Sequence, residues 1–530
     1  PECLFGSRAP DNAGNNRFDD FTGGTAADFA CFFQLAPVGG SVGYMSWLQG
    51  GQDYLFAGTF GGPFRISGSG LDIPITPLSI NVRQFDTAGC EEAMAVGCAE
   101  VFFLQRGGTT LRSIKLLNQY LSTFESVDMC LNAEQIPYSR LRRVVLQHGR
   151  PDTLWVLRDD GVLAGMTVHI TSLAADAVAG WHRHKIGGAS AKVIDVGVIQ
   201  RTDLNDQIWI VAERTVNGTT RRTVEIMADD VAFPDAEDFF SDEESEDDDL
   251  TLFNNAVYRL QEQYVHMDAA AAANGSDRGV AAAATMTPGA TTGTSVAFTA
   301  SAAVFTSADV GKEIWKKPSA TTGVGGGRAV ITGYSSTTSV TAKITVAFDS
   351  TAAIAAGDWY FAGTAIYGLY HLEGSRVAVV TDGAVYSDGQ TDDYPTVTVA
   401  NGHITLTAAA AVVWVGLPYT GLIKSHNLDL GAKSGPSQAK PRNISTMFIR
   451  FLNTLGVEFG TDLYAMESVE HRNSNANMDR PAPVFSGIRK LPYGDSWDAE
   501  TEKHVVVAQK LPLPAIVQFI DVEYDTTDEG

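Results

Sequence analysis

The sequence is poor in positive charge and in cysteine, and it has no long run of apolar residues. Its 38 Lys and Arg stand against 62 Asp and Glu, which gives a formal net charge of −24 over 530 residues. Proteins that grip nucleic acid through its phosphates carry basic surfaces, so this balance argues against sequence-specific or tight nucleic-acid binding. No segment reaches the roughly 18–20 apolar residues of a membrane-spanning helix. We therefore expect no membrane-spanning segment.

The cysteines are also few, and they exclude two kinds of site. They are Cys3, Cys31, Cys90, Cys98 and Cys130. Their number is odd and none forms a Cys-x-x-Cys pair, so neither a zinc ribbon nor a thioredoxin-type motif is supported. Free, mostly buried thiols in a reducing compartment fit better than a disulfide framework. We expect no metal and no cofactor.

What the sequence does contain is typical of turn-rich β structure. Hydrophobic residues make up 44% of the chain, charged residues only 19%, and there are 52 glycines. This is enough apolar material to fold, and the length predicts about two to four domains. The chain lacks a starting Met and a signal peptide, and Pro1-Glu-Cys-Leu-Phe-Gly-Ser-Arg8 is typical of the middle of a strand. From this opening we expect that an N-terminal portion precedes residue 1.

Four segments repeat one pattern, in which an apolar strand, a polar turn and a second strand follow one another. They begin at intervals of about 47–54 residues and a weaker fifth copy follows later. The segments are Asp53–Ile66, Glu100–Ile114, Asp152–Met166 and Asp206–Thr219, with the fifth at Arg376–Tyr386. Asp160-Gly161, Asn217-Gly218 and Asp382-Gly383 supply turn residues that adopt positive φ. Each segment is predicted to be a hairpin whose first arm is buried on both faces.

A hairpin about every 50 residues is typical of β-propeller blades, although a β-sandwich with regular hairpins would show the same spacing. We favour the propeller. Between the repeats, residues 115–147 have apolar residues at helical spacing and predict one or two short helices. The fold class expected is thus mainly β: a partial β-propeller of hairpin blades, a small inserted β domain, a C-terminal β domain and few short helices.

Composition shifts along the chain predict the domain boundaries. Residues 269–284 are rich in Ala and Gly, and residues 285–361 are rich in Thr, Ser, Ala, Val and Gly. The domains predicted are 1–268, propeller-like; 269–284, a linker; 285–361, an inserted β module; 362–426, a return to the propeller-like domain; and 427–530, a C-terminal β domain.

Each motif that could have a catalytic or binding role is explained better by a structural role. Gly325-Gly-Gly-Arg328 lacks the Lys-Ser/Thr of a P-loop, and Gly39-Gly-Ser-Val-Gly43 lacks the strand and helix of a nucleophile elbow. The acidic block Ser241–Leu250 has no Gly and no EF-hand spacing, so a solvated loop is favoured over a calcium site. Arg140–Arg143 is a strand-end or interface feature rather than a nucleic-acid patch.

Two pairs of side chains are the remaining candidates. His182 and His184 share one strand face and could be metal ligands, but no third ligand is signalled, so half-exposed structural histidines are favoured. Asp159-Asp160 could be an acid/base pair, but Asp before a turn glycine is a structural choice. The sequons at Asn217, Asn274 and Asn443 are uninformative without a secretory route. We therefore predict no catalytic, cofactor-binding or metal-binding residues.

Several segments together resemble one family. The stretch Val101-Phe-Phe-Leu-Gln-Arg-Gly-Gly108, with Leu111-Arg112, resembles a segment of the tail nozzle (tail tubular protein B-like) proteins of short-tailed, podovirus-type bacteriophages. Similar stretches follow in the family's order, and the resemblance covers most of the chain outside 285–361. They are Trp47-Leu48, Gly58–Gly62, Thr153–Gly161, Val178–His184, Gly368–Gly374, Asp382-Gly383, Val415–Tyr419, Arg450–Gly456 and Pro512–Val517.

The resemblance implies a structural, non-enzymatic virion protein. It implies a homohexameric ring in the virion tail, made in the host cytoplasm, which conducts double-stranded DNA during ejection and docks the tail adaptor and tail fibres. The module at 285–361 resembles the small β insert called FCCH-like. An acidic wall would repel DNA and let it slide.

Two other functions stay open. The first is a propeller-type glycosidase or depolymerase of host surface polysaccharide, which would need two carboxylates about 5–10 Å apart in a cleft. The second is a carbohydrate-binding adhesion module in which the Thr-rich insert touches the cell.

Overall fold

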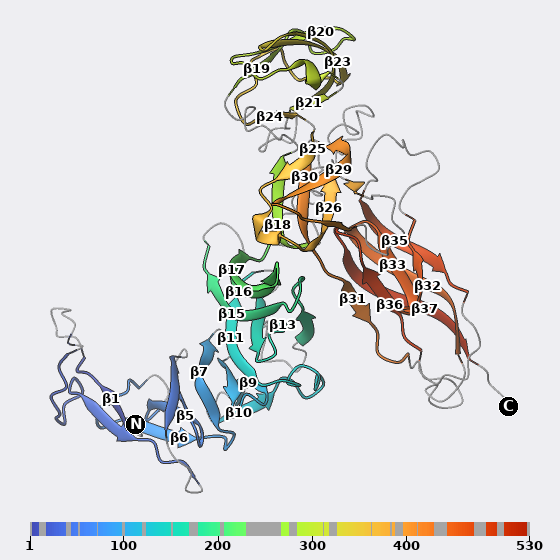
Figure 1. Ribbon diagram of the computed structural model, residues 1–530. Helices are drawn as coiled ribbons and strands as arrows, with labels where there is room; N and C mark the ends of the chain where they lie inside the picture. The colour runs from blue at the N-terminus through green and yellow to red at the C-terminus, as the bar shows by residue number, and fades with distance from the viewer. Residues whose placement is uncertain are drawn as a thin grey trace, which may run out of the picture. The chain divides into compact units, whose positions relative to one another are not determined.

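The computed structural model divides into two compact units, which we describe separately (Figure 1). Unit 1 comprises Pro1–Ile186, Ser190–Arg214 and Arg221–Val231, and unit 2 comprises Gly187–Ala189, Thr215–Thr220 and Ala232–Gly530. The structure describes residues 3–9, 17, 19–38, 44–50, 54–70, 73–97, 101–118, 123–149, 152–168, 179–201, 206–228, 267–274, 284–310, 312–316, 326–361, 363–381, 384–386, 396–410, 412–428, 442–470, 484–494 and 503–526.

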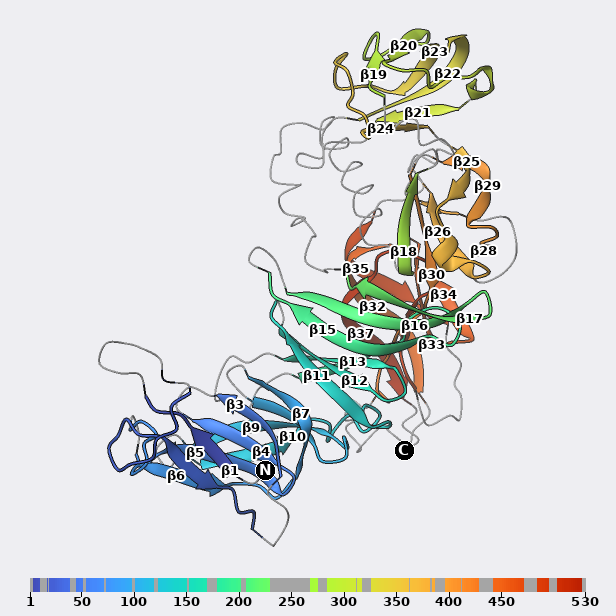
Figure 2. The same ribbon diagram turned by 60° about the vertical axis from the view of Figure 1, so that its left-hand side comes forward.

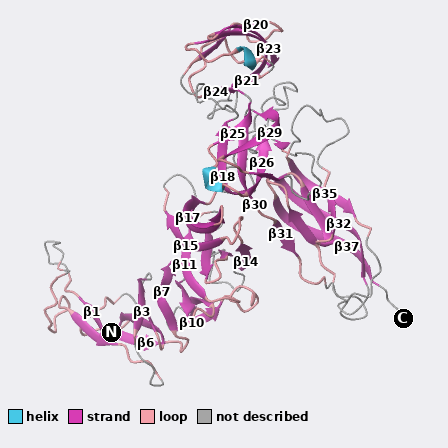
Figure 3. Cartoon of the chain, viewed as in Figure 1, coloured by secondary structure: helices cyan, strands magenta, loops and turns pink. Residues whose placement is uncertain are grey.

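The mainly β fold predicted from the sequence is confirmed (Figure 3). Within the described ranges the helices are two single 3₁₀ turns, η3 (Ser307–Asp309) and η4 (Tyr370–Leu372). Neither is long or apolar enough to cross a membrane. Antiparallel strand pairing therefore supplies most backbone hydrogen bonds in the described part of the chain.

Unit 1 is a series of antiparallel sheets in chain order. The first pairs β1 (Cys3–Gly6) with β2 (Cys31–Gln34). Three four-stranded sheets follow: β3 (Met45–Gly50), β4 (Leu55–Thr59), β5 (Gly62–Gly68) and β6 (Ile80–Gln84); β7 (Cys90–Gly97), β8 (Val101–Gln105), β9 (Leu111–Asn118) and β10 (Thr123–Asp128); β11 (Leu141–Gln147), β12 (Asp152–Arg158), β13 (Leu163–Val168) and β14 (Ala179–His184). The last sheet contains β15 (Lys192–Ile199), β16 (Gln207–Val216) and β17 (Thr219–Ile226).

All four main repeats are hairpins, as predicted. They form β4–β5, β8–β9, β12–β13 and β16–β17, the second and third strands of each sheet. In the last of them Asn217 has φ 47° and Gly218 has φ 71°, so both turn residues are left-handed. That is the geometry of a type I′ turn, which only Asn, Asp and Gly enter at low cost. The residues of the turn therefore fix the position of this hairpin in the sequence.

Neighbouring sheets of unit 1 pack face to face through shared apolar cores. On β8, Phe102 lies in one core with residues of β11–β13, and Phe103 lies in another core with Trp47 of β3. Figure 2 shows these sheets following one another in chain order. A strand covered on both sides must be apolar throughout, which explains the unbroken run in β8. In β16, by contrast, burial alternates, because only one face is packed.

The predicted helices between residues 115 and 147 are wrong. Lys115–Asn118 is the end of β9, which pairs with β10, and β11 begins at Leu141. Between them Ala133 and Ile136 close successive turns by donating their backbone N–H groups to Cys130 and Ala133. Apolar residues at helical spacing also fit a strand with a β-bulge, and β9 and β10 carry such a shift between Thr123 and Phe124.

In unit 2, the residues of the Thr-rich module form one six-stranded sheet in the order β19-β20-β23-β22-β21-β24. The strands are β19 (Met286–Pro288), β20 (Val296–Ala300), β21 (Glu313–Lys316), β22 (Gly327–Ser336), β23 (Ser339–Val346) and β24 (Trp359–Phe361). The sheet curls around its own core, in which Phe298, Phe305 and Trp359 are fully buried. The indole N–H of Trp359 donates to the carbonyl of Ala284 at 2.8 Å.

A second core of unit 2 lies among strands on either side of the module in the sequence. One sheet joins β18 (Met267–Asn274), β30 (Val412–Pro418), β26 (Arg376–Thr381), β27 (Ala384–Val385) and β28 (Thr396–Thr398), and another joins β25 (Gly363–Tyr367) to β29 (His403–Ala410). The predicted fifth hairpin is β26–β27, but its sheet is not a meander like those of unit 1.

The linker predicted at 269–284 is wrong for its first six residues. They belong to β18, which pairs with β30 through a β-bulge at Ala269, where φ is 48°. Alanine is a poor strand former, but β30 offers pairing partners to Met267, Asp268 and Ala271–Asn274. Gly416 of β30 leaves room for this approach, since a Cβ there would lie 2.8 Å from that of Met267. Residues 275–283 lie outside the described residues.

The C-terminal strands form a two-sheet sandwich. One sheet has the order β31-β36-β33-β34 and the other β35-β32-β37. The strands are β31 (Gly421–Lys424), β32 (Arg442–Thr454), β33 (Val457–Asp462), β34 (Ala465–Ser468), β35 (Phe485–Pro492), β36 (Val506–Gln509) and β37 (Ile516–Thr526). Met447 and Ile449 of β32 share a core with Phe459 of β33 and Val507 of β36. The strand after Pro512 and Pro514 is an edge strand, as predicted.

Candidate functional site

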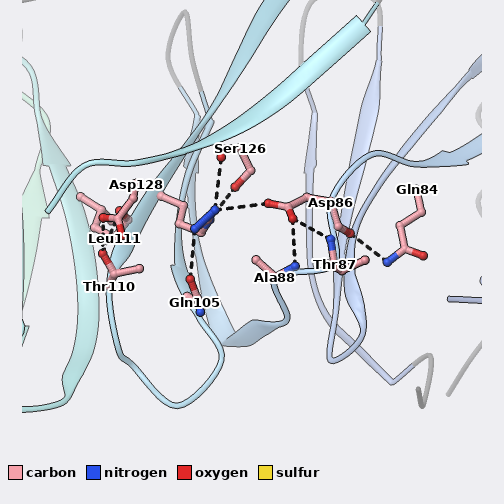
Figure 4. A network of polar contacts seen from close by, with 10 residues as sticks. Gln84, Asp86, Thr87, Ala88, Gln105, Thr110, Leu111, Ser126 and Asp128 are labelled. Carbon is pink, nitrogen blue, oxygen red and sulfur yellow. Dashed lines mark hydrogen bonds and ion pairs between the residues drawn. The ribbon is translucent and has the colours of Figure 1, made fainter. Parts of the chain in front are cut away.

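A polar cluster of unit 1 is built around Arg112 of β9, in the segment that carries the family resemblance. Figure 4 shows its partners Gln105, Ser126 and Asp86. Its Nε donates to Ser126 Oγ at 2.7 Å, and Nη1 donates to Gln105 Oε1 at 3.2 Å. Nη2 lies 3.6 Å from Asp86 Oδ2, and the two side chains are 18% and 21% exposed. One guanidinium thus contacts three polar side chains from β8, β10 and the loop after β6.

Asp86 is itself held from the other side. Its Oδ1 accepts the backbone N–H groups of Thr87 and Ala88 at 2.6 and 3.0 Å, and its carbonyl accepts Gln84 Nε2 at 2.8 Å. Because the Asp86 loop belongs to the β3–β6 sheet and Arg112 to the β7–β10 sheet, the cluster fastens two neighbouring sheets at their rim.

Replacing Arg112 with lysine tests this fastening. An ammonium cannot reproduce the fork that serves Ser126, Gln105 and Asp86 together, so we expect a loss of about 1–2 kcal/mol in the free energy of unfolding. Urea unfolding followed by tryptophan fluorescence measures it. Arg83→Lys on β6, whose side chain is exposed, is the control and should change stability by less than about 0.5 kcal/mol. Equal effects of the two variants would contradict the role of Arg112.

The Asp159-Asp160 pair is part of a turn. Asp160 Oδ1 accepts Arg158 Nε at 3.0 Å, and its Oδ2 forms an ion pair with Nη2 of the same arginine. Arg158 is almost fully buried and also donates to the carbonyl of Gln135 at 3.1 Å. Asp159 is exposed, and its backbone N–H bonds to the carbonyl of Arg140. Asp160 therefore compensates a buried cation, which matches the structural reading of the sequence.

The two histidines of β14 do lie together. His182 Nδ1 and His184 Nε2 are 2.7 Å apart, and both rings make edge contacts with Trp155. Gly165 provides the space, since a Cβ there would lie 2.0 Å from His182 Cε1. Burial lowers the pKa of His182, and burial and the neighbouring His182 lower the pKa of His184 to about 4. The pair is therefore neutral at pH 7.

This lowered pKa predicts acid sensitivity. The unfolded chain binds the proton near pH 6.5, whereas the folded chain resists it down to about 4. Stability from His184 is thus complete above pH 6.5 and is lost as pH falls toward 4, by about 3 kcal/mol. Urea unfolding at pH 7, 5.5 and 4 checks this. His184→Gln should flatten the slope relative to the unaltered chain, and an unchanged slope would contradict the assignment.

The arginines at 140–143 make polar contacts to neighbouring sheets. Arg140 Nη2 lies 2.9 Å from Glu91 Oε1 on β7, and Arg143 Nη1 lies 3.1 Å from Asp195 Oδ1 on β15. Arg142 donates to the carbonyl of Ile194. Arg140, just before β11, therefore contacts the preceding sheet, and Arg142 and Arg143 of β11 contact the following one. This bears out the interface interpretation of the sequence.

The other sequence candidates lie partly outside the described residues. Gly39–Gly43 and Ser241–Leu250 lie outside the described residues, as does Gly325. Arg328 lies in β22 and pairs with Val346. The sequons are at the β16–β17 turn, the end of β18 and within β32.

Sequence reasoning missed a largely buried ion pair of unit 1. Arg214 on β16 forms a double contact with Glu225 on β17, and Nη2 lies 3.0 Å from Oε2. The two residues lie on opposite arms of one predicted hairpin but are not directly opposite in it, so opposite charges on the two arms of an Asn-Gly hairpin are the only signal that could have pointed to the pair.

Among the described residues, no group of three or more His, Cys, Asp or Glu side chains is placed to hold a metal ion. No family model matches the chain, and no curated protein matches it. The fold defines a mainly β protein of many small antiparallel sheets.

Proposed function

We propose that this chain is a structural subunit of the tail nozzle of a short-tailed bacteriophage. The observation that carries the proposal is the place of its most characteristic segment. Val101–Gly108 with Leu111-Arg112 forms the β8–β9 hairpin, which supplies apolar side chains to two cores and the central guanidinium of the polar cluster. In this proposal the segment has a structural role, since its side chains hold neighbouring sheets together.

The meanders of unit 1 are blades of a partial β-propeller in this proposal. Face-to-face packing of successive four-stranded antiparallel sheets supports it, since blades bury both faces only against their neighbours. The protein is non-enzymatic. The support is that the candidate Asp160 is engaged with Arg158, and that the candidate histidines His182 and His184 contact each other.

In the virion tail, six copies form a ring that docks the adaptor and the fibres and passes double-stranded DNA. With a net charge of −24, acidic side chains on the channel wall would keep DNA from adhering.

Mass photometry and electron microscopy of the purified protein test the assembly, and antibody labelling of virions tests its place. We expect six-fold rings and label on the tail. A protein that stays monomeric and is absent from virions would refute the proposal.

A further inference from the structure

The three-stranded sheet of the C-terminal sandwich has two long edges. Strand β32 lies in the middle and pairs with β35 on one side and β37 on the other. In the part of the chain that the structure describes, β35 and β37 each have a strand partner on one side only. Such edges present backbone donors and acceptors to any further strand, which makes them natural places for another chain to add.

The register arranges exposed side chains of this sheet in rows. In one row Ile488 of β35 and Phe519 of β37 lie on either side of Arg450. Ile488 is 54% exposed and Phe519 is 40% exposed. The opposite face of the sheet is buried, with Ile449 in the core and Ile520 packed against it. Each edge thus offers an apolar side chain to solvent on the outer face.

The next row carries opposite charges at its two ends. Lys490 of β35 and Asp521 of β37 lie on either side of Phe448, and the Lys490 ammonium is 5.5 Å from the centre of the Phe448 ring. Both charged residues are exposed, as is Glu523 two residues further along β37. The outer face is therefore positive at the β35 edge and negative at the β37 edge.

The strand directions make these two edges complementary between copies. Since β35 and β37 both run antiparallel to β32, they run parallel to each other. A second copy displaced sideways along the sheet brings its β35 beside β37 of the first copy. Because each row crosses the strands, the same displacement places Ile488 of the second copy beside Phe519, and Lys490 of the second copy beside Asp521.

We propose that copies of this chain join head to tail through parallel pairing of β37 with β35 of the next copy. The inference rests on the proposed ring. A contact between two different edges forms a closed ring when the rotation from one copy to the next returns to the first copy after a whole number of subunits. The occupant of each edge is a second copy, on the ground of charge and apolar complementarity. An alternative use of the same charges is to keep the edges from pairing at all.

Charge reversal tests the pairing. Lys490→Asp or Asp521→Lys alone places like charges together and is expected to raise the dissociation constant of the assembly about 10–100-fold. The double variant restores the opposite charges in swapped order and should return within about threefold of the unaltered chain. Lys343→Asp, at an exposed site on β23 of the module, is the matched control. Unchanged circular dichroism and melting show that each variant folds.

Cysteine crosslinking gives a readout that does not depend on affinity. Ile488→Cys and Phe519→Cys in one chain cannot bridge within that chain, because β32 separates their strands by about 10 Å and a disulfide spans at most about 7 Å between Cα atoms. Oxidation should therefore produce a ladder of covalent multimers. Each single cysteine variant, which keeps the five native cysteines, is the control and should give no ladder.

The outcomes separate this inference from the proposed function. Three results support the inference. Each single charge reversal weakens assembly, the double reversal restores it, and the double cysteine variant gives a ladder of covalent multimers. An unaltered chain that is monomeric at all concentrations overturns both the ring and this interface. A stable ring that neither reversal weakens, and that gives no ladder, overturns the interface and leaves the ring standing.

Discussion

Phe102→Ala and Phe103→Ala are each expected to lower the free energy of unfolding of unit 1 by about 3–5 kcal/mol. The two side chains are adjacent, point to opposite faces of β8 and are both fully buried. Phe102 packs toward the β11–β14 sheet, and Phe103 packs toward the β3–β6 sheet with its ring 5.5 Å from that of Trp47. In a sheet with one solvated face, one of two adjacent phenylalanines would be exposed.

Urea unfolding of both variants measures the effect. Val224→Ala on β17 is the control, because Val224 is 65% exposed and its truncation should cost less than about 0.5 kcal/mol. If only one phenylalanine proved costly, the sheets would not be stacked on both sides of β8.

Arg214→Met is expected to cost about 3–5 kcal/mol, because it leaves a carboxylate without its partner in a mostly buried place. The Arg214 side chain is 5% exposed and that of Glu225 is 18% exposed. The carboxylate also accepts the hydroxyl of Thr223 at 2.6 Å, which cannot replace a cation.

The double variant Arg214→Met with Glu225→Met distinguishes a charge effect from a packing effect. Replacing a buried pair with apolar side chains of similar volume is often nearly neutral, so we expect most of the loss to be recovered. Arg222→Met removes an exposed partner of Glu213 and should cost about 0–1 kcal/mol. A double variant as unstable as the single one would show that the arginine acts through its packing alone.

The hairpins could be predicted from sequence because their signals are local. Gly161, Asn217 and Gly218 adopt positive φ in their turns, and the run Val101–Leu104 can be a strand only where both faces are covered. The outer strands of the sheets gave no such signal. In β6, Ile80-Asn-Val-Arg-Gln84 mixes polar and apolar residues, because an edge strand is only partly covered.

The errors and the missed contacts have a common physical cause. Residues 115–118 and 269–274 became strands because a distant or adjacent strand offered hydrogen-bond partners that outweigh local preference. Arg112 and Asp86 meet only because two sheets stack, and the distance of 26 positions between them carries no trace of this. For Asp160 and the arginines near residue 140, for which the sequence favoured structural roles, the structure shows ion pairs within the chain.

The indole of Trp359 holds the carbonyl of Ala284 at 2.8 Å, and both residues are completely buried. The two points at which the chain enters and leaves the Thr-rich module are thereby tied together. An inserted segment whose two ends lie close together perturbs the surrounding chain little, since its removal leaves only a short gap to bridge. The two ends of the module thus lie close enough together for a short linker to take its place.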